Sequence, residues 1–410
     1  MYFLEDKIAQ RLGGKSFGKV SKEYKFRKIK KTKEEAIKKY PFISLIDLGV
    51  GEPDLAADER VVSILSKEAG KPENRWYADN GILEFQEAAV QYLNKVYGLK
   101  GLDPNENILH GIGTKSMLAM LPACFINPGD VVLTTIPGYP ILSSNTQYFG
   151  GEIYPLPLHE ENSFYPDFTA IPKSILNKAK LLYLNYPNNP TGQVATYDFY
   201  QEAVSIALQY GIVIVSDAAY GPITFDDHRP ISLFSVPDAS HVGIELHSLS
   251  KAFNMTGWRL AFALGSPEMI KAYSAIKDTT DSGQFRAIQK AGAFALQHID
   301  IIEANCQRYS RRMDFLIEIL QEVGFKATKP QGTFYCYVPI PKGTKSGIRF
   351  TNAEEVATHI LEHALISTVP WDDVGSYLRL SVTFEAKDLE SEKELLEELK
   401  RRLLSLELVF

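Results

Sequence analysis

From about residue 47 onward, short apolar runs rich in β-branched residues alternate with longer segments of helical periodicity. The short runs with apolar residues on both faces lie at 131–135, 181–185, 212–217, 244–248 and 259–263. Runs of this kind are typical of strands buried on both sides, as in a parallel sheet covered by helices. Helical patterns at 116–125 and 197–210 lie between them, so the alternation predicts an open α/β sheet.

The C-terminal part of the chain has a different pattern. A long amphipathic helix comes first and is followed by short alternating strands and helices, at 302–323, 333–339, 353–364, 377–383 and 389–404. We therefore predict a large α/β domain, with a mainly parallel sheet between helices, and a smaller α+β domain. The expected division is 1–46 for an N-terminal arm and part of the small domain, 47–290 for the large ligand-binding domain, and 291–410 for the small C-terminal domain.

Composition narrows the class of protein. The 410 residues are 45% hydrophobic and 23% charged, which is ordinary for a globular protein and excludes a disordered or fibrous chain. The net charge of −6 gives no general attraction to nucleic acid or to anionic lipid. The three cysteines stand far apart, and no apolar run approaches the roughly 18 residues of a membrane span. We expect a cytoplasmic protein without disulfides.

Polar side chains gather at the carboxyl ends of the expected strands, where open α/β sheets bind ligands. The strand at 181–185 leads into Asn185-Tyr-Pro-Asn-Asn189-Pro-Thr-Gly192, a turn whose composition indicates a rigid loop with outward amide groups. The strand at 212–217 ends in Asp217, and a carboxylate directly after a buried strand needs a partner.

A second polar group follows the strand at 244–248. It reads Ser248-Leu-Ser250-Lys251, and Arg259 comes eight residues after the lysine. A lysine amine forms a Schiff base with an aldehyde, while serine and arginine side chains bind a phosphate. With Asp217 to keep a ring nitrogen protonated, these groups meet the demands of pyridoxal 5′-phosphate. The ordered set predicts a site for that cofactor.

These motifs resemble the signature of the fold-type I aminotransferases of class I and II. Asn189-Pro-Thr-Gly192, Asp217-Ala-Ala-Tyr220 and Ser248-Leu-Ser250-Lys251 occur in that family's order and approximate spacing, with Arg259 after them. The resemblance implies that Lys251 binds the cofactor aldehyde and then acts as general base and acid. It also implies that Asp217 pairs with the ring nitrogen, while Asn189 and Tyr220 hydrogen-bond the phenolic oxygen.

The same resemblance assigns the remaining cofactor contacts and one substrate contact. Residues implied to bind the phosphate are Ser248, Ser250 and Arg259, together with Thr114 and Lys115 at the start of a helix. A helix N-terminus favours an anion on physical grounds as well. Tyr139 lies where the family stacks an aromatic ring on the cofactor, and Arg379 matches the arginine that binds the substrate α-carboxylate.

Other residues make the chain similar to the LL-diaminopimelate aminotransferase family. Tyr24-Lys-Phe and Gly49-Val-Gly51-Glu match motifs of that family near the N-terminus. Lys115 is implied to reach a distal carboxylate of the substrate, and Asp79 to receive a distal ammonium group. Ser282 is a departure, because it replaces an asparagine that the family has before a glycine.

The resemblance implies a homodimer that shares its active sites, with the following residues coming from the partner subunit: Tyr24, the cleft tyrosine Tyr77, Asp79 and Ser282. The expected reaction is transamination between glutamate and tetrahydrodipicolinate to give LL-2,6-diaminopimelate, a precursor of lysine and peptidoglycan. A broader aminotransferase for aspartate, alanine or aromatic amino acids is one alternative. The other is a non-catalytic pyridoxal-binding regulator, although 1–46 is too short for the DNA-binding domain of such proteins.

One further motif matches the spacing of a known type of metal site. His359-Ile-Leu-Glu362-His363 has the H-x-x-E-H spacing of a zinc peptidase, on an expected helix. Because no third ligand accompanies it and it lies in the expected small domain, we predict no metal site.

Overall fold

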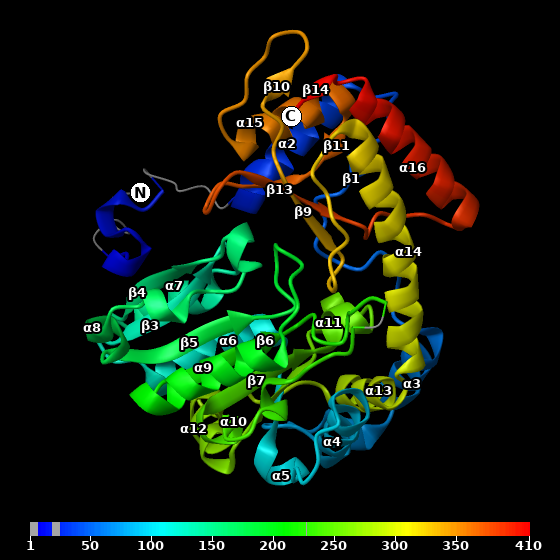
Figure 1. The fold of residues 1–410 in the computed structure, drawn as a ribbon. Helices are drawn as coiled ribbons and strands as arrows, with labels where there is room; N and C mark the ends of the chain where they lie inside the picture. Colours follow the sequence, from blue (N-terminus) through cyan, green and yellow to red (C-terminus); the bar gives the residue numbers. More distant parts are fainter. Residues whose placement is uncertain (1–6, 19–24, 227) are drawn as a thin grey trace.

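The structure, a computed structural model, describes residues 7–18, 25–226 and 228–410. Its central element is a seven-stranded sheet in the order β2-β8-β7-β6-β5-β3-β4 (Figure 1). The strands are β2 (Ile108–Gly111), β3 (Val131–Ile136), β4 (Glu152–Pro157), β5 (Ala179–Asn185), β6 (Val213–Ala218), β7 (Gly243–Ser248) and β8 (Ala261–Gly265). Strands β3 to β7 run parallel, which confirms the mainly parallel α/β sheet predicted from the sequence.

Two features of the sheet differ from the prediction. Strand β8 begins at Ala261 rather than at residue 259, and it runs antiparallel to both β7 and β2. The connection from β7 contains only α11 (Leu249–Ala252) and the 3₁₀ turn η7 (Thr256–Trp258), with no long crossover helix to return the chain in parallel. Strands β2 and β4 are short or partly exposed, and we did not predict them.

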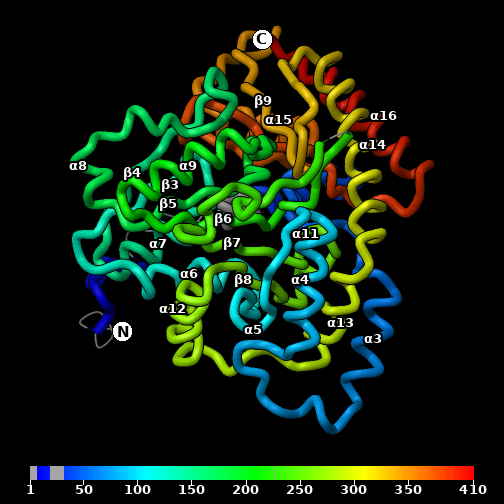
Figure 2. Tube along the Cα trace, turned by 60° about the horizontal axis from the view of Figure 1, so that its bottom comes forward, coloured from blue at the N-terminus to red at the C-terminus, as the bar shows by residue number. Residues whose placement is uncertain are grey.

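Helices cover both faces of the sheet. On β5, Leu182 and Leu184 pack into a core with α9, whereas Leu181 and Tyr183 point to the opposite face and pack with α6 and α12. Figure 2 shows α9 on one side of the strands and α6 and α12 on the other. The covering helices are α6 (Thr114–Phe125), α7 (Ile141–Tyr148), α8 (Lys173–Leu176), α9 (Tyr197–Tyr210), α10 (Ala239–Val242) and α12 (Pro267–Lys277).

The bounds of α9 show how local chemistry starts and stops a helix. The Thr196 side chain accepts a hydrogen bond from the Phe199 backbone N–H, which satisfies one of the free donors of the first turn. Asp198 places a negative charge in that turn. Gly211 ends the helix in the left-handed region at φ 68°, where a side chain is disfavoured. These signals account for the agreement with the predicted range 197–210.

A second helical group packs beside β2 and β8. It consists of α3 (Glu59–Ala69), α4 (Leu83–Tyr97), α5 (Pro104–Asn107) and α13 (Arg286–Gln297). Phe85 of α4 is fully buried and meets Phe262 of β8 edge to face, at 6.2 Å between ring centres. This group belongs to the same apolar core as the C-terminal elements, so the two parts of the chain are joined by packing as well as by α14.

The C-terminal part forms a smaller α+β unit at the top of Figure 1. Its three-stranded antiparallel sheet has the order β12-β13-β9, and α14 runs along one side of the molecule to reach it (Figure 1). The elements are α14 (Asp300–Val323), β9 (Tyr335–Pro339), β10 (Gly343–Thr344), α15 (Ala353–Ala364), β11 (Ile366–Ser367), β12 (Val369–Trp371), β13 (Tyr377–Ser381), α16 (Leu389–Leu404) and β14 (Leu408–Val409).

The N-terminal segment joins this smaller unit. Helix α2 (Lys25–Lys39) packs on α15 through buried Ala36, and β1 (Ile46–Asp47) pairs in parallel with β11. Strand β1 contains residues on both sides of the boundary that we placed after residue 46, and both pair with β11. The division into 1–46, 47–290 and 291–410 stays a prediction. Among the residues described, no helix has the length and apolarity needed to cross a membrane.

Candidate active site

A cavity of about 710 Å³ lies at the carboxyl ends of β5, β6 and β7, beneath the smaller unit. This is the edge of an open α/β sheet at which ligands bind. Among its lining residues are these sequence-predicted site residues: Gly51, Thr114, Lys115, Tyr139, Asn189, Asp217, Tyr220, Ser248, Ser250, Lys251, Arg259 and Arg379. Segments more than 300 residues apart in the chain thus meet around one space.

Lys251 places a half-buried amine in the cavity. It belongs to the short helix α11, directly after β7, and its Nζ donates a hydrogen bond to the Gly51 carbonyl at 2.6 Å. Burial lowers the pKa of Lys251 to about 8; Glu52 opposes this shift, while Arg379 and Arg259 add to it. A much larger fraction of this amine is therefore neutral near pH 8 than of an ordinary lysine, and the neutral amine is the nucleophile.

Asp217 places a buried carboxyl group in the same cavity. It lies near the end of β6 and accepts hydrogen bonds from the Tyr183 hydroxyl at 3.1 Å and from the Ala219 backbone N–H at 3.2 Å. Burial raises the pKa of Asp217 to about 6, against the lowering effect of these donors. A carboxyl group in this condition is stabilised by a cationic partner, and a protonated ring nitrogen is such a partner.

One end of the cavity is suited to an anion. Thr114 and Lys115 open α6 and line the cavity, and the free N–H groups of a helix N-terminus favour an anion. Ser248 and Ser250 line the same cavity, and the Ser248 hydroxyl accepts a hydrogen bond from the Ser250 N–H at 3.1 Å. The Arg259 guanidinium completes a set of donors that matches a phosphate.

The approach of Arg259 depends on a glycine. Gly113 lies at φ 77°, and a Cβ on it would overlap the Arg259 guanidinium. Arg259 itself has a left-handed backbone at φ 57°, a conformation that costs roughly 1–2 kcal/mol for a non-glycine residue. Gln284 supports this strained turn, since its Nε2 donates to the Trp258 carbonyl at 2.6 Å and to the Arg259 carbonyl at 3.0 Å.

Arg379 lies on the opposite wall, in strand β13 of the smaller unit. It is 2% exposed; Nη1 donates to the Asn189 amide oxygen at 2.9 Å and Nη2 donates to the Gly49 carbonyl at 3.2 Å. Its guanidinium carbon lies 4.1 Å from the centre of the Tyr335 ring. Its Nε is buried and has no hydrogen-bond partner among the residues that the structure describes, so a donor remains available for a carboxylate.

Tyr220 and Asn189 are fixed by neighbours that we did not single out from the sequence. The Tyr220 hydroxyl lies 3.0 Å from the Tyr335 hydroxyl, and burial raises the pKa of Tyr220 well above its usual value. Asn185 donates to the Asp217 carbonyl at 2.8 Å and accepts from the Asn189 N–H at 3.0 Å. Asn185 thus links the turn at 185–192 to the end of β6.

Three predicted site residues lie outside the cavity lining. Tyr77, Asp79 and Ser282 are exposed, and the Asp79 N–H donates to the Ser282 carbonyl at 3.1 Å, so the two segments that carry them are adjacent. Arg286 supports the same surface, since its guanidinium donates to the Trp76 and Tyr77 carbonyls. Tyr24, a further prediction, lies outside the described residues.

Sequence reasoning missed several residues that build this site. Asn185 ends an expected strand, so the strand-end rule could have identified its side chain. Tyr335 lies inside an expected strand, and Trp371 and Gln284 also carry no local motif that marks them as parts of a cavity wall or its support. Their roles depend on the packing of the smaller unit and of the loop at 282–286.

The H-x-x-E-H motif lies on α15, away from this cavity. The His359 and His363 rings are 4.4 Å apart between centres, so they share one helix face as the spacing requires. Within the part of the chain that the structure describes, no group of three or more His, Cys, Asp or Glu side chains could hold a metal ion.

Fold and site together define an enzyme that carries out amine chemistry on an open α/β sheet. The chain belongs to the family "Aminotransferase class I and II", whose model matches residues 43–395. That family depends in general on pyridoxal 5′-phosphate. The prediction of an enzyme is confirmed over the alternative of a non-catalytic regulator, and the chain is an aminotransferase.

Curated relatives match over the whole chain. It is 52% identical to "LL-diaminopimelate aminotransferase" of Methanocaldococcus jannaschii, over 100% of this chain and 99% of that protein. It is 50% identical to the protein of the same name in Methanococcus maripaludis, again over 100% and 99% of the two chains. The predicted resemblance to this family is confirmed.

Solved structures have the same fold. Substrate-bound BacF from Bacillus subtilis is 34% identical, with a TM-score of 0.85 over 94% of this chain and 96% of that chain. A probable N-succinyldiaminopimelate aminotransferase from Thermus thermophilus is 27% identical, with a TM-score of 0.84 over 93% and 100% of the two chains. The fold-type I architecture predicted from the sequence is confirmed.

Gly113→Ala is expected to weaken the binding of pyridoxal 5′-phosphate about 10- to 100-fold, the equivalent of one lost charge-assisted hydrogen bond. The new methyl group would displace the Arg259 guanidinium. Equilibrium titration of the cofactor-free protein measures the change. Gly70→Ala is the control, because Gly70 has open space around it and lies outside the cavity lining. Equal affinity of the two variants would contradict the role given to Gly113.

The rate at which Lys251 reacts with pyridoxal 5′-phosphate is expected to reach its plateau as the pH rises through about 8, because the neutral amine attacks. Glu52 raises the pKa of this amine, so Glu52→Gln moves the midpoint to lower pH. Arg379 lowers it, so Arg379→Met moves the midpoint to higher pH. Stopped-flow absorbance of the cofactor-free protein gives the profile. A midpoint near the ordinary lysine value of roughly 10.4, unmoved by either change, is the contrary result.

Proposed function

We propose that this chain is a pyridoxal 5′-phosphate-dependent aminotransferase that transfers an amino group between glutamate and 2-oxoglutarate on one side and tetrahydrodipicolinate and LL-2,6-diaminopimelate on the other. The observation that carries the cofactor assignment is the half-buried Lys251 amine, with Asp217 in the same cavity and an anion-binding end formed by Arg259 and the start of α6. The substrate assignment rests on the names of the relatives that match the whole chain.

The residues present fit the cofactor. Because Gly113 has no side chain, the Arg259 guanidinium can lie against the start of α6, and a guanidinium in that position suits the phosphate. The raised pKa of Asp217 suits a pairing with the ring nitrogen, because a cationic partner favours the ionised carboxylate. Tyr220 and Asn189 would contact the phenolic oxygen and Tyr139 the ring face. When bound, pyridoxal 5′-phosphate supplies an aldehyde that reacts with amines and a ring that accepts an electron pair.

The chain's own residues then carry out the proton transfers. Lys251 would take the proton from the substrate Cα as general base and later give a proton back as general acid, and such transfers typically contribute 10²–10⁴-fold to the rate. Its depressed pKa suits both roles near neutral pH. Arg379 binds the substrate α-carboxylate with its free Nε and so presents the Cα–H bond to Lys251.

Specificity for a substrate with two amino-acid ends needs groups beyond Arg379. Lys115 lines the cavity and is exposed, so its ammonium could reach a distal carboxylate. Asp79 would receive the distal ammonium, a group that aspartate or alanine lacks. Gly51 lies close to Tyr335, and a side chain there would meet the Tyr335 hydroxyl, so glycine keeps this part of the cavity open.

A homodimer would complete the site. Trp76 and Tyr77 are 58% and 78% exposed, which is high for large aromatic side chains, and they adjoin exposed Asp79 and Ser282. Because these residues do not line the cavity of their own chain, we propose that they contact the cavity of a second copy. The role of Tyr24, the dimer and a cytoplasmic location stay predictions from the sequence.

Lys251→Ala is expected to abolish the visible absorbance band of the purified protein and to lower the single-turnover rate with glutamate by roughly 10²–10⁴-fold. The reason is that no other amine would take both its covalent role and its proton-transfer role. Absorbance spectroscopy and stopped-flow kinetics measure the two effects. Lys180→Ala, which removes an exposed lysine of β5, should change neither. A band that survives Lys251→Ala unchanged rules out the assignment.

Asp79→Ala and Lys115→Ala are each expected to lower turnover of diaminopimelate by about 10- to 100-fold, the cost of leaving one charged end of the substrate unpaired. The half-reaction with glutamate should change much less in Asp79→Ala, since glutamate has no distal ammonium. Steady-state assays with 2-oxoglutarate as acceptor give both numbers. Asp198→Ala, on an exposed position of α9, is the control. Equal losses with both substrates would favour a broader aminotransferase.

A further inference from the structure

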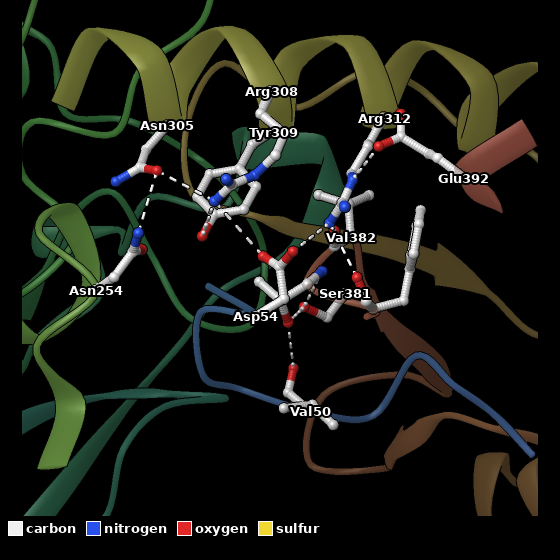
Figure 3. A network of polar contacts seen from close by, with 12 residues as sticks. Val50, Asp54, Asn254, Asn305, Arg308, Tyr309, Arg312, Ser381, Val382 and Glu392 are labelled. Carbon is white, nitrogen blue, oxygen red and sulfur yellow. Dashed lines mark hydrogen bonds and ion pairs between the residues drawn. The ribbon is translucent and has the colours of Figure 1, made fainter. Parts of the chain in front are cut away.

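A row of polar side chains on one face of α14 lies behind the active site. Asn305, Arg308 and Arg312 are spaced three and four residues apart, so they project from the same side of the helix (Figure 3). Asn305 and Arg312 are 4% and 2% exposed, and the side chain of Arg308 is 15% exposed. Groups this polar are buried only when partners compensate for the lost water.

Arg312 donates hydrogen bonds to two carboxylates and two backbone carbonyls. Its Nη1 donates to the Asp54 carboxylate and to the Val382 and Phe384 carbonyls, each at 3.0 Å, while Nε donates to Glu392 at 2.8 Å (Figure 3). The Asp54 and Glu392 side chains are only 1% and 5% exposed. Arg312 thereby ties Asp54 to the end of β13 and to α16.

Through Asp54 this contact reaches the acceptor of the catalytic amine. The segment 50–54 is attached to the smaller unit at both ends, by Asp54 and by the Val50 carbonyl, which accepts from the Thr383 hydroxyl at 3.4 Å. Between these two points, the Gly51 carbonyl accepts the hydrogen bond from Lys251 Nζ. The position of that carbonyl is therefore fixed from α14 and β13.

Asn305 reaches the other side of the same lysine. Its Nδ2 donates to the carbonyl of Ala252, the residue after Lys251, at 2.9 Å. Its Oδ1 accepts from Arg308 Nη2 at 3.1 Å and from Asn254 Nδ2 at 3.3 Å (Figure 3). Helix α11 has only four residues, so carbonyls at its end need partners from outside the helix.

Arg308 connects the two ends of the row. Its guanidinium bonds to Asn305 and lies 3.6 Å from the Asp54 carboxylate, so Asn305 and Asp54 belong to one connected set. We call Asn305, Arg308, Arg312 and Asp54 the α14 cluster. Its two ends terminate on the backbone beside Lys251 and on the segment that carries the acceptor of Lys251.

We propose that the α14 cluster is a positioning device for Lys251, which fixes both the backbone that carries this side chain and the carbonyl that receives its amine. The inference rests on the proposed function of Lys251 as the cofactor-binding base. None of the four residues lines the cavity, so they act through Lys251 and not on the substrate. A misplacement of about 1 Å at a reacting group can cost 10²-fold in rate.

The test replaces Asn305 with leucine, an uncharged residue of similar size that cannot donate to the Ala252 carbonyl. The holoenzyme is expected to keep its substrate KM within about twofold, while kcat falls about tenfold or more. The pH midpoint of the visible absorbance of the bound cofactor should also move, because this spectrum reports the surroundings of the Lys251 nitrogen.

Gln86→Met is the matched control. Gln86 is also a buried amide, and it donates to a backbone carbonyl, that of Ile108, at 3.1 Å and outside the cavity lining. Gln86→Met should alter thermal stability, but it should leave the spectral midpoint unmoved and should not lower kcat selectively relative to KM. If Asn305→Leu behaves as Gln86→Met does, the cluster is structural only and the inference is wrong.

A second variant covers the case in which Asn305→Leu does not fold. Asp54→Asn keeps the shape of the side chain but removes its charge, and the same shift in midpoint and kcat is expected from the other end of the cluster. An unchanged midpoint and kcat in a folded Asp54→Asn overturn the inference. If the unmodified protein itself has no visible band with pyridoxal 5′-phosphate, the proposed function fails and the inference fails with it.

Discussion

The active site is organised around one half-buried amine, that of Lys251. Lys251 carries a potential positive charge into the cavity beneath the smaller unit, where burial lowers its pKa to about 8. Burial removes part of the hydration of the ammonium; the Gly51 carbonyl accepts a hydrogen bond from it and Glu52 favours its charged form, while two arginines oppose that form. The groups that set this balance, in particular Gly51, Glu52 and the two arginines of the cavity, come from distant parts of the sequence.

The same constraint explains why the smaller unit is part of the active site. Arg379 lies on β13, yet its guanidinium donates to Asn189 and Gly49, and its face packs on Tyr335. A cationic side chain that is 2% exposed is stable only with such partners. Closing the cavity with β9 and β13 thus supplies the carboxylate-binding donor and shields the amine at the same time.

Much of this arrangement was predictable because it follows local rules. Strands β3, β5, β6 and β7 have continuous apolar runs, and their polar ends identified Asp217 and the Ser248–Lys251 segment as neighbours. The bounds of α9, α15 and α16 agree with the sequence patterns, since caps and amphipathic periods mark them.

The remainder depends on contacts between distant segments. Strand β8 turns antiparallel because of the short connection that precedes it, and no residue pattern states its direction. Tyr335 belongs to the site because its hydroxyl lies next to that of Tyr220. Asn305 supports the site because α14 brings it to the Ala252 carbonyl. Asp79 and Tyr77 were singled out by resemblance alone, and in a single chain they lie on the surface.

The central claim is that the Lys251 amine bonds covalently to the cofactor. Its most direct test is to reduce the holoenzyme with borohydride, which fixes any bond between the cofactor and its lysine, and then to map the modified peptide by mass spectrometry. The account predicts that the added mass lies on Lys251. Modification of Lys115 or another lysine, with Lys251 unmodified, would contradict it.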